Sequence, residues 1–214
     1  MYSNVCSNEH HDEMVVLIHG LIRSHKSMHR LGQYLRRHGY EMVLYDYPSR
    51  EYSITEHGVR LNAYIAHLLS NHPTKKFHFV THSLGGIIAR EALSNLTKEQ
   101  LNRCEHLIML APPTQGSSLA QLFVKWFPFL TSFIRPLAEL SASQEAYVHQ
   151  VAIPAELKIG VIAGRFDAKT PPPVTHIEGE KDFIMINAAH TFIMNHPKGR
   201  KAILNFLRKT SFVD

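Results

Sequence analysis

The feature that most constrains this chain is the stretch around Ser83. Residues 77–80, Phe-His-Phe-Val, favour a strand, and His-Ser-Leu-Gly-Gly follows at 82–86, after which apolar residues recur at helical spacing. A serine at the apex of such a strand–turn–helix takes an unusual backbone conformation that holds its Oγ above the sheet. The helix N-terminus then faces any oxyanion formed there. The stretch therefore predicts that Ser83 is a nucleophile.

A turn this tight needs small residues where the strand and the helix cross. Gly85 meets that need two positions after the serine, whereas Thr81 stands two positions before it, where the G-x-S-x-G pattern has glycine. We expect the turn to tolerate the threonine. The alternative is a plain strand-to-helix turn in which Ser83 only caps the helix.

Apolar runs alternate with amphipathic segments along the whole chain. Continuous apolar runs are typical of strands buried on both faces. Strands are expected at 14–18, 42–45, 77–81, 106–110, 158–163 and 183–186, and helices at 54–71, 84–96 and 197–209, with another that Ser27 caps and Gly39 ends. The alternation predicts an α/β fold, with a doubly wound, mostly parallel sheet of about six strands and helices on both faces. We expect one domain over residues 1–214.

Composition excludes several classes of protein. The chain has 214 residues, 44% of them hydrophobic, and no apolar run long enough to span a membrane. The first thirteen residues lack the basic and apolar regions of a signal peptide, so we expect a cytoplasmic protein unless a presequence has been removed. Two cysteines, Cys6 and Cys104, are too few for a disulfide framework.

The charge pattern argues against a nucleic-acid partner. The net charge is +5, but the basic residues are scattered and no aromatic side chains are interleaved with them. They are compatible with transient contact with an anionic lipid surface. The run His10-His11-Asp12-Glu13 lacks the ligand spacing of a defined metal site, so no metal is expected.

Activation of a serine hydroxyl requires a base, usually histidine, and a carboxylate that orients it. In a doubly wound sheet the site lies at the carboxyl ends of the strands, so these residues should follow strands. Asp167 follows the fifth expected strand and His190 follows the sixth. Alternatives remain for both roles: Asp46, Asp182, Glu178 or Glu180 for the acid, and His82, His176 or His196 for the base.

An oxyanion hole needs two backbone N–H groups. Leu84, directly after the serine, supplies one candidate. The second is Leu21, in the loop after the first strand, where Gly20 permits close approach of the backbone. We expect His19 and Gly20 to line the substrate site as well.

Five blocks in this order resemble the α/β-hydrolase superfamily, and within it small bacterial lipase-like and esterase-like proteins. The resemblance covers nearly everything from Met14 to Leu207. It implies hydrolysis of carboxylic esters through an acyl-enzyme, with Ser83 as nucleophile, His190 as base, Asp167 as acid and no cofactor. The blocks are Val16–Leu21, Asp46–Arg50, Thr81–Gly86, Leu110–Ser117, and a last one made of Lys181–Phe183 and His190–Phe192.

Two segments depart from the family pattern or extend it. The segment around Asp167 carries three prolines, at 171–173, and lacks the Asp-Gly pair that relatives often have there. An apolar insertion at 118–151 falls where family members carry a lid or acyl-binding cap. We expect Trp126, Phe127 and Phe129 of this cap to contact an acyl chain, and packing against the sheet is the alternative.

The sequence thus predicts a monomeric esterase or lipase that acts on small-molecule or lipid esters with an apolar acyl group. The same triad also serves thioesterases, amidases and acyltransferases. A lipid- or partner-binding module without catalysis is a further alternative, since a fold does not imply a function.

Overall fold

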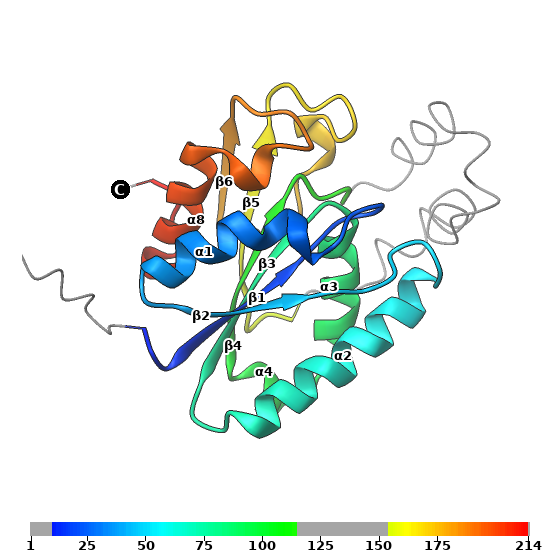
Figure 1. Cartoon of the computed structure of the whole chain (residues 1–214), viewed down its shortest axis with the longest axis vertical. Coiled ribbons are helices and arrows are strands. Elements are labelled where there is room, and N and C mark those ends of the chain that lie inside the picture. Colours follow the sequence, from blue (N-terminus) through cyan, green and yellow to red (C-terminus); the bar gives the residue numbers. More distant parts are fainter. Residues whose placement is uncertain (1–9, 115–153, 214) are drawn as a thin grey trace, which may run out of the picture.

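The computed structural model describes residues 10–114 and 154–213. Six strands form one parallel sheet in the order β2-β1-β3-β4-β5-β6 (Figure 1). The fold class predicted from the sequence is confirmed. The strands are β1 (Glu13–Ile18), β2 (Glu41–Tyr45), β3 (Lys76–His82), β4 (Cys104–Leu110), β5 (Lys158–Gly164) and β6 (Asp182–Ile186).

Helices cover both faces of this sheet, and each face has its own hydrophobic core. One core includes apolar residues of α2 and α3, and the other includes those of α1 and α8 (Figure 1). Central strands contribute to both cores, which explains why their sequences are mostly apolar on both faces. The helices are α1 (His29–Arg37), α2 (Ile54–Asn71), α3 (Leu84–Ser94), the short α4 (Lys98–Leu101) and α8 (Pro197–Lys209), with 3₁₀ turns at His25–Met28, Pro172–Val174 and Ile193–Asn195.

One predicted helix start is wrong. Ser27 lies inside the 3₁₀ turn His25–Met28, and α1 begins only at His29. The Ser27 hydroxyl donates to the carbonyl of Ser24 at 2.8 Å. Because that local bond occupies the hydroxyl and a 3₁₀ turn precedes the helix, Ser27 does not act as the cap.

The strand order places a topological switch point between β1 and β3. From β1 the chain crosses to β2 on one side and then to β3 on the other. Connections therefore leave the carboxyl ends of β1 and β3 in opposite directions, which opens a crevice where ligands bind in such sheets. Gly20 follows β1 and Ser83 follows β3, so both lie at this point.

The expected cap at 118–151, with Trp126, Phe127 and Phe129, lies outside the described residues. Within the described ranges, no helix is both long and apolar enough to cross a membrane.

Candidate active site

Ser83 sits at the apex between β3 and α3 in a strained backbone conformation. Its φ is 52° and its ψ is −125°, a combination that a non-glycine residue rarely adopts. Its N–H donates to the carbonyl of Leu110 at 2.9 Å, and its carbonyl accepts from the N–H of Gly86 at 2.9 Å. The side chain makes no capping hydrogen bond to α3. Ser83 therefore does not behave as an ordinary helix cap.

Two glycines let α3 pass close to the sheet. A Cβ on Gly85 would lie 2.5 Å from the carbonyl oxygen of His19, so that position cannot hold a side chain without moving the backbone of β1. A Cβ on Gly86 would lie 3.2 Å from Thr81 Oγ1 and 2.7 Å from the end of Met109. The room that Gly86 leaves is what accommodates the threonine at the first position of the turn.

The loop after β1 approaches the serine directly. A Cβ on Gly20 would lie 3.1 Å from Ser83 Cβ and 2.8 Å from His82 Nδ1. Leu21 follows in this loop and is partly buried. Leu84 is the first residue of α3, so its N–H has no acceptor within the helix. Gly20 thus brings the backbone that carries one candidate oxyanion donor close to the serine.

His19 supports this loop through its ring. It is fully buried, and its Nδ1 lies 2.9 Å from the carbonyl oxygen of Gly20. Its Nε2 faces the N–H of Tyr47 at 3.4 Å, and the Tyr47 hydroxyl donates to the His19 carbonyl at 2.8 Å. Burial lowers the pKa of His19, which keeps the ring neutral. The side chain therefore holds the loop in place, and the expected contact of His19 with a substrate stays a prediction.

Asp167 and His190 lie together, although 23 residues separate them. Asp167 Oδ2 is 2.7 Å from His190 Nδ1, and both side chains are buried. An ionised carboxylate only accepts hydrogen bonds, so Nδ1 carries the proton. The Nε2 atom of the neutral ring is then the basic nitrogen.

Thr170 contacts both members of this pair, a role that none of the sequence patterns above predicted. Its Oγ1 donates to Asp167 Oδ2 at 2.7 Å and lies 3.0 Å from His190 Nδ1. The backbone N–H groups of Lys169 and Thr170 donate to Asp167 Oδ1 at 2.9 and 2.8 Å. An aspartate that bonds backbone two and three residues ahead is a known turn signal. The Asp-x-x-Thr spacing could therefore have indicated the threonine.

The hydrogen bonds around Asp167 control its charge. Burial by itself would raise the pKa of this carboxyl. The hydrogen bond from His190 and those from Thr170 outweigh burial, so the pKa lies below its ordinary value. Asp167 is therefore ionised at neutral pH and stabilises positive charge on the imidazole beside it.

His82 anchors the loop that carries His190. Its Nε2 donates to the carbonyl of His190 at 3.0 Å, and the two ring centroids lie 4.8 Å apart. Burial, followed by the repulsion of His190, lowers the pKa of His82 to about 3. A neutral His82 next to Ser83 thus links the turn at Ser83 to the loop that carries His190.

Several of the alternative acids and bases have other partners in the described structure. Asp46 pairs with the His25 ring at 2.9 Å and accepts from the His25 N–H at 3.0 Å. Asp182 accepts from the N–H of Phe212 at the amino end of β6, away from Ser83. Glu180 pairs with His176 at 2.7 Å, whereas His196 precedes α8 and Glu178 stands beside a turn glycine.

A pocket of about 540 Å³ opens beside the loop after β1. Residues 22–24 and 46–51 line it. Arg23, on its wall, donates from Nη2 to Thr191 Oγ1 at 3.1 Å, which ties the pocket to the residue after His190. The pocket therefore adjoins the region where Gly20 and Ser83 approach each other.

Comparison with known proteins identifies a family for this chain. A family model described as "Putative serine esterase (DUF676)" matches residues 8–205. A lysosomal thioesterase, PPT2-B of Xenopus laevis, is 25% identical over 136 residues, which is 61% of this chain and 44% of the relative. The match therefore spans less than half the length of that relative.

Solved structures share the fold. The mature lipase BlEst2 of Bacillus licheniformis has a TM-score of 0.74 at 18% identity, covering 92% of this chain and 91% of its own. The Pyrococcus furiosus esterase Pf2001 has a TM-score of 0.70 at 20% identity, covering 97% of this chain and 85% of its own. At this identity the likeness establishes the α/β-hydrolase fold.

Proposed function

The chain belongs to the family described as putative serine esterases, DUF676, and from this premise we propose that it cleaves carboxylic esters with an apolar acyl group through an acyl-enzyme. Ser83 is the nucleophile, His190 the general base and Asp167 the carboxylate that orients it. The backbone N–H groups of Leu21 and Leu84 stabilise the oxyanion.

The reaction proceeds in two halves. Ser83 Oγ attacks the acyl carbonyl while His190 Nε2 takes its proton, and the ester C–O bond breaks as the imidazolium protonates the leaving alcohol. Water then attacks the acyl-enzyme with the same base, which releases the acid and restores the serine. Asp167 keeps the proton of His190 on Nδ1 throughout.

The observation that carries the proposal is the backbone of Ser83. A serine that only capped a helix would adopt an extended conformation and accept a bond from the first turn. Ser83 instead has a φ of 52° and makes no such bond. Strain of this kind costs about 1–3 kcal/mol and persists where function requires it.

The test combines covalent labelling with kinetics. A fluorophosphonate probe should phosphonylate Ser83 Oγ and release fluoride, which peptide mass spectrometry locates. Ser83→Ala should lower kcat/KM on p-nitrophenyl esters by about 10³-fold or more. Ser94→Ala is the control, because that hydroxyl donates to the carbonyl of Glu91 at the far end of α3. Labelling elsewhere, or equal rates in the two variants, would refute the proposal.

Thioester hydrolysis is the second candidate, because the matched relative from Xenopus laevis is a thioesterase. Ester and thioester substrates with the same acyl chain separate the two. A kcat/KM at least tenfold higher on one of them would assign the preference. If neither the ester nor the thioester is hydrolysed although the chain still binds them, the chain is a binding module on a hydrolase scaffold.

Acyl length is the remaining part of the proposal. Acyl chains from two to sixteen carbons, presented below and above their solubility limit, report what the residues at 118–151 accommodate. A rise in rate with aggregated substrate would support action at a lipid surface.

A further inference from the structure

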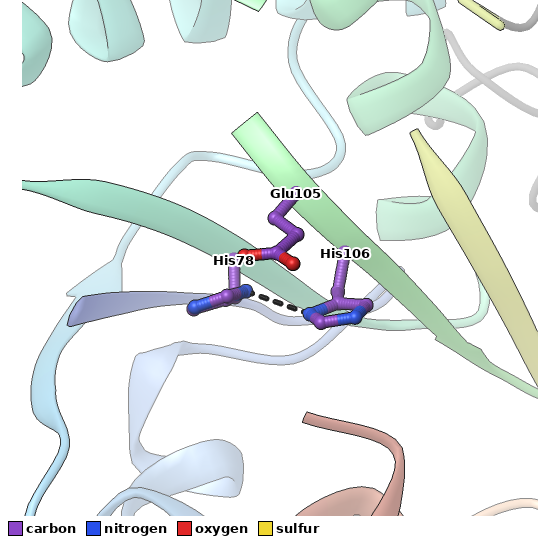
Figure 2. A group of neighbouring side chains, drawn as sticks. All are labelled: His78, Glu105 and His106. Atoms are coloured by element: carbon purple, nitrogen blue, oxygen red, sulfur yellow. Dashed lines mark hydrogen bonds between the residues drawn. The ribbon is translucent and has the colours of Figure 1, made fainter. Parts of the chain in front are cut away.

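A second cluster of polar side chains lies at the other end of the sheet from Ser83. His78 and His106 face each other from β3 and β4, and Glu105 lies beside them (Figure 2). His78 is five positions before Ser83, about 16 Å along the strand. Ester cleavage as proposed above makes no use of these residues.

A shift in strand register explains how three ligating side chains meet. Phe77 pairs with Cys104, but the next residue, His78, pairs with His106, so Glu105 is an extra residue in β4. Side chains normally alternate between the faces of a strand. The extra residue interrupts that alternation. It leaves Glu105 beside His106, and ligand atoms of Glu105 and the two histidines all lie within 4.8 Å of one another.

The two imidazoles present nitrogen atoms to each other. His78 Nδ1 and His106 Nδ1 are 3.0 Å apart, and both residues are buried. His78 Nε2 lies 3.0 Å from Glu13 Oε2. Because a carboxylate only accepts, Nε2 of His78 carries the proton, and Nδ1 of the neutral ring offers a lone pair.

His106 can take either of two arrangements. Its Nε2 lies 3.1 Å from Thr210 Oγ1, a hydroxyl that can donate or accept. When the hydroxyl donates, His106 Nδ1–H bonds His78 Nδ1. When the hydroxyl accepts, both Nδ1 atoms are bare, and a cation must lie between them.

We propose that His78 Nδ1, His106 Nδ1 and the Glu105 carboxylate bind a divalent transition-metal ion of the Zn²⁺ type. Imidazole and carboxylate ligands suit this ion, which commonly takes three protein ligands and a water. Metal–nitrogen bonds of about 2.0–2.1 Å would separate the two Nδ1 atoms to about 3.3 Å, a change of a few tenths of an ångström. Binding selects the second arrangement: the proton of neutral His106 is then on Nε2, where the Thr210 hydroxyl accepts it, so both rings bind the ion without losing a proton.

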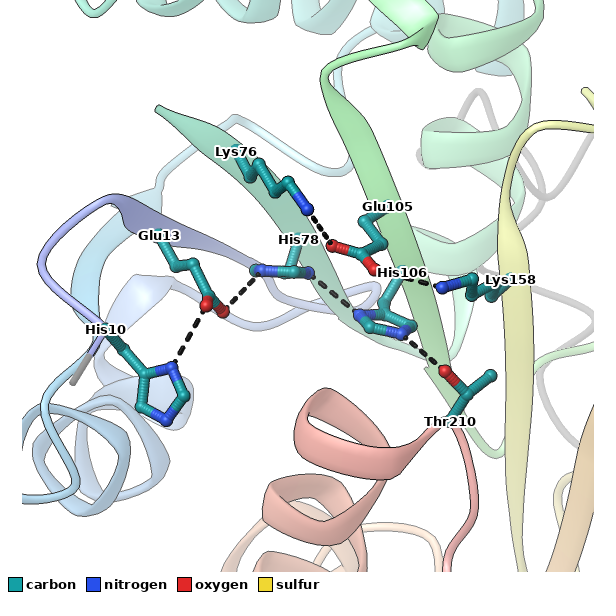
Figure 3. A network of polar contacts seen from close by, with 8 residues as sticks. All are labelled: His10, Glu13, Lys76, His78, Glu105, His106, Lys158 and Thr210. Carbon is teal, nitrogen blue, oxygen red and sulfur yellow. Dashed lines mark hydrogen bonds and ion pairs between the residues drawn. The ribbon is translucent and has the colours of Figure 1, made fainter. Parts of the chain in front are cut away.

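The surroundings resemble the outer shell of such a site (Figure 3). Glu13 orients His78 and Thr210 orients His106, as outer partners of ligating histidines do. Glu105 is paired with Lys158 at 3.0 Å and Lys76 at 3.4 Å. Both lysine side chains are well exposed, so these ion pairs are weak and can open when the carboxylate turns to a metal. The ion would join β3 and β4 and, through Thr210, the end of α8.

The test uses the full chain without an affinity tag, stripped of metal by a chelator and then dialysed. One equivalent of Co²⁺ should give the visible absorption of an imidazole-bound ion. Zn²⁺ at about one hundred times its Kd should raise the melting temperature by about 5–10 °C. Calorimetry in buffers of different ionisation enthalpy should report no net proton release from the two neutral rings.

Variants locate the ion. Glu105→Gln should weaken Zn²⁺ binding by at least tenfold, and His106→Gln should abolish it. His176→Gln is the matched control, because it removes another histidine that is paired with a carboxylate, Glu180, and should bind Zn²⁺ as the wild type does. Unchanged affinity in Glu105→Gln and His106→Gln would overturn the proposal.

A wild-type crystal soaked in Zn²⁺ tests the proposal even if a histidine variant fails to fold. Anomalous density between His78 and His106 supports it. Density only elsewhere, such as at His10 and His11, or none at all, shows that the two rings merely share a proton.

Discussion

Thr170 Oγ1 donates to Asp167 Oδ2, the same oxygen atom that faces His190 Nδ1. The hydroxyl and the imidazole thus meet the same carboxylate oxygen side by side, with Thr170 Oγ1 3.0 Å from His190 Nδ1. The single proton of the hydroxyl goes to the carboxylate, so the hydroxyl can only accept from His190. Thr170 is therefore a positioning residue for the candidate base.

Replacing Thr170 by valine tests this arrangement. Thr170→Val keeps the shape and removes one hydrogen bond to a charged group, so kcat should fall about tenfold while KM changes little. Thr170→Ser should restore most of the rate. Kinetics on a chromogenic ester, with a thermal melt of each variant, provide the measurement. A fall in stability without a fall in kcat would assign Thr170 a purely structural role.

Gly20→Ala should separate activity from folding. The added methyl would press on Ser83 Cβ and His82, so the loop that carries Leu21 must move away from the serine. We expect kcat/KM to fall about 10²-fold, as when an oxyanion donor is lost. Gly32→Ala is the control, because its methyl meets the flexible end of Met42 on the opposite face of the sheet and should leave the rate unchanged. Equal rates in the two variants would contradict this reading of the loop.

The two glycines of α3 should differ in their effect on stability. A methyl on Gly85 would meet backbone oxygen atoms of β1, which cannot yield, whereas one on Gly86 would mainly meet the end of Met109. Gly85→Ala should therefore lower the free energy of unfolding by about 2–3 kcal/mol, and Gly86→Ala by roughly half as much. Urea unfolding of both variants measures the difference. The reverse order would show that β1 and α3 adjust more easily than Met109 does.

Glu13 should make a pH-dependent contribution to stability. Burial would raise its pKa, but hydrogen bonds with His78 and His10 outweigh burial and lower the pKa from 4.5 to about 2. A carboxyl whose pKa is lowered in the folded chain stabilises the fold at pH values above its ordinary pKa. That stabilisation is lost as the pH falls through the pKa of the folded chain. The wild type should therefore exceed Glu13→Gln in unfolding free energy above about pH 4.5, and the gap should close toward pH 2.

Urea unfolding from pH 7 to pH 3, in the presence of a chelator, provides the measurement. Glu51→Gln, which alters an exposed carboxylate, is the control and should show no such gap. A gap that stays constant over the whole range would show that the charge of Glu13 contributes nothing.

Local signals accounted for most of the architecture. The apolar runs predicted all six strands to within two residues at their starts, and the strand–serine–helix pattern predicted the turn at Ser83. These succeeded because hydrophobic periodicity and turn chemistry act over neighbouring residues. The start of α1 was missed because a 3₁₀ turn and a helix share the same capping residues.

The order of residues along the chain also indicated which groups could meet. Residues that follow parallel strands reach the same edge of the sheet, which is why Asp167 and His190 could be named as candidates. The resemblance already implied Asp167 as the acid, although Asp46 also follows a strand. In the folded chain Asp46 binds His25, whereas Asp167 lies 2.7 Å from His190.

The sequence by itself thus determined the fold class, the strained serine turn and a short set of candidate partners, because each depends on contacts between near neighbours. Only the tertiary structure decided that Thr170 shares the Asp167 carboxylate, that His82 holds the loop of His190, and that His78 meets His106. The last two contacts join residues 108 and 28 positions apart. Contacts of that kind depend on strand order and on a one-residue shift in register, which the packing of the whole sheet selects.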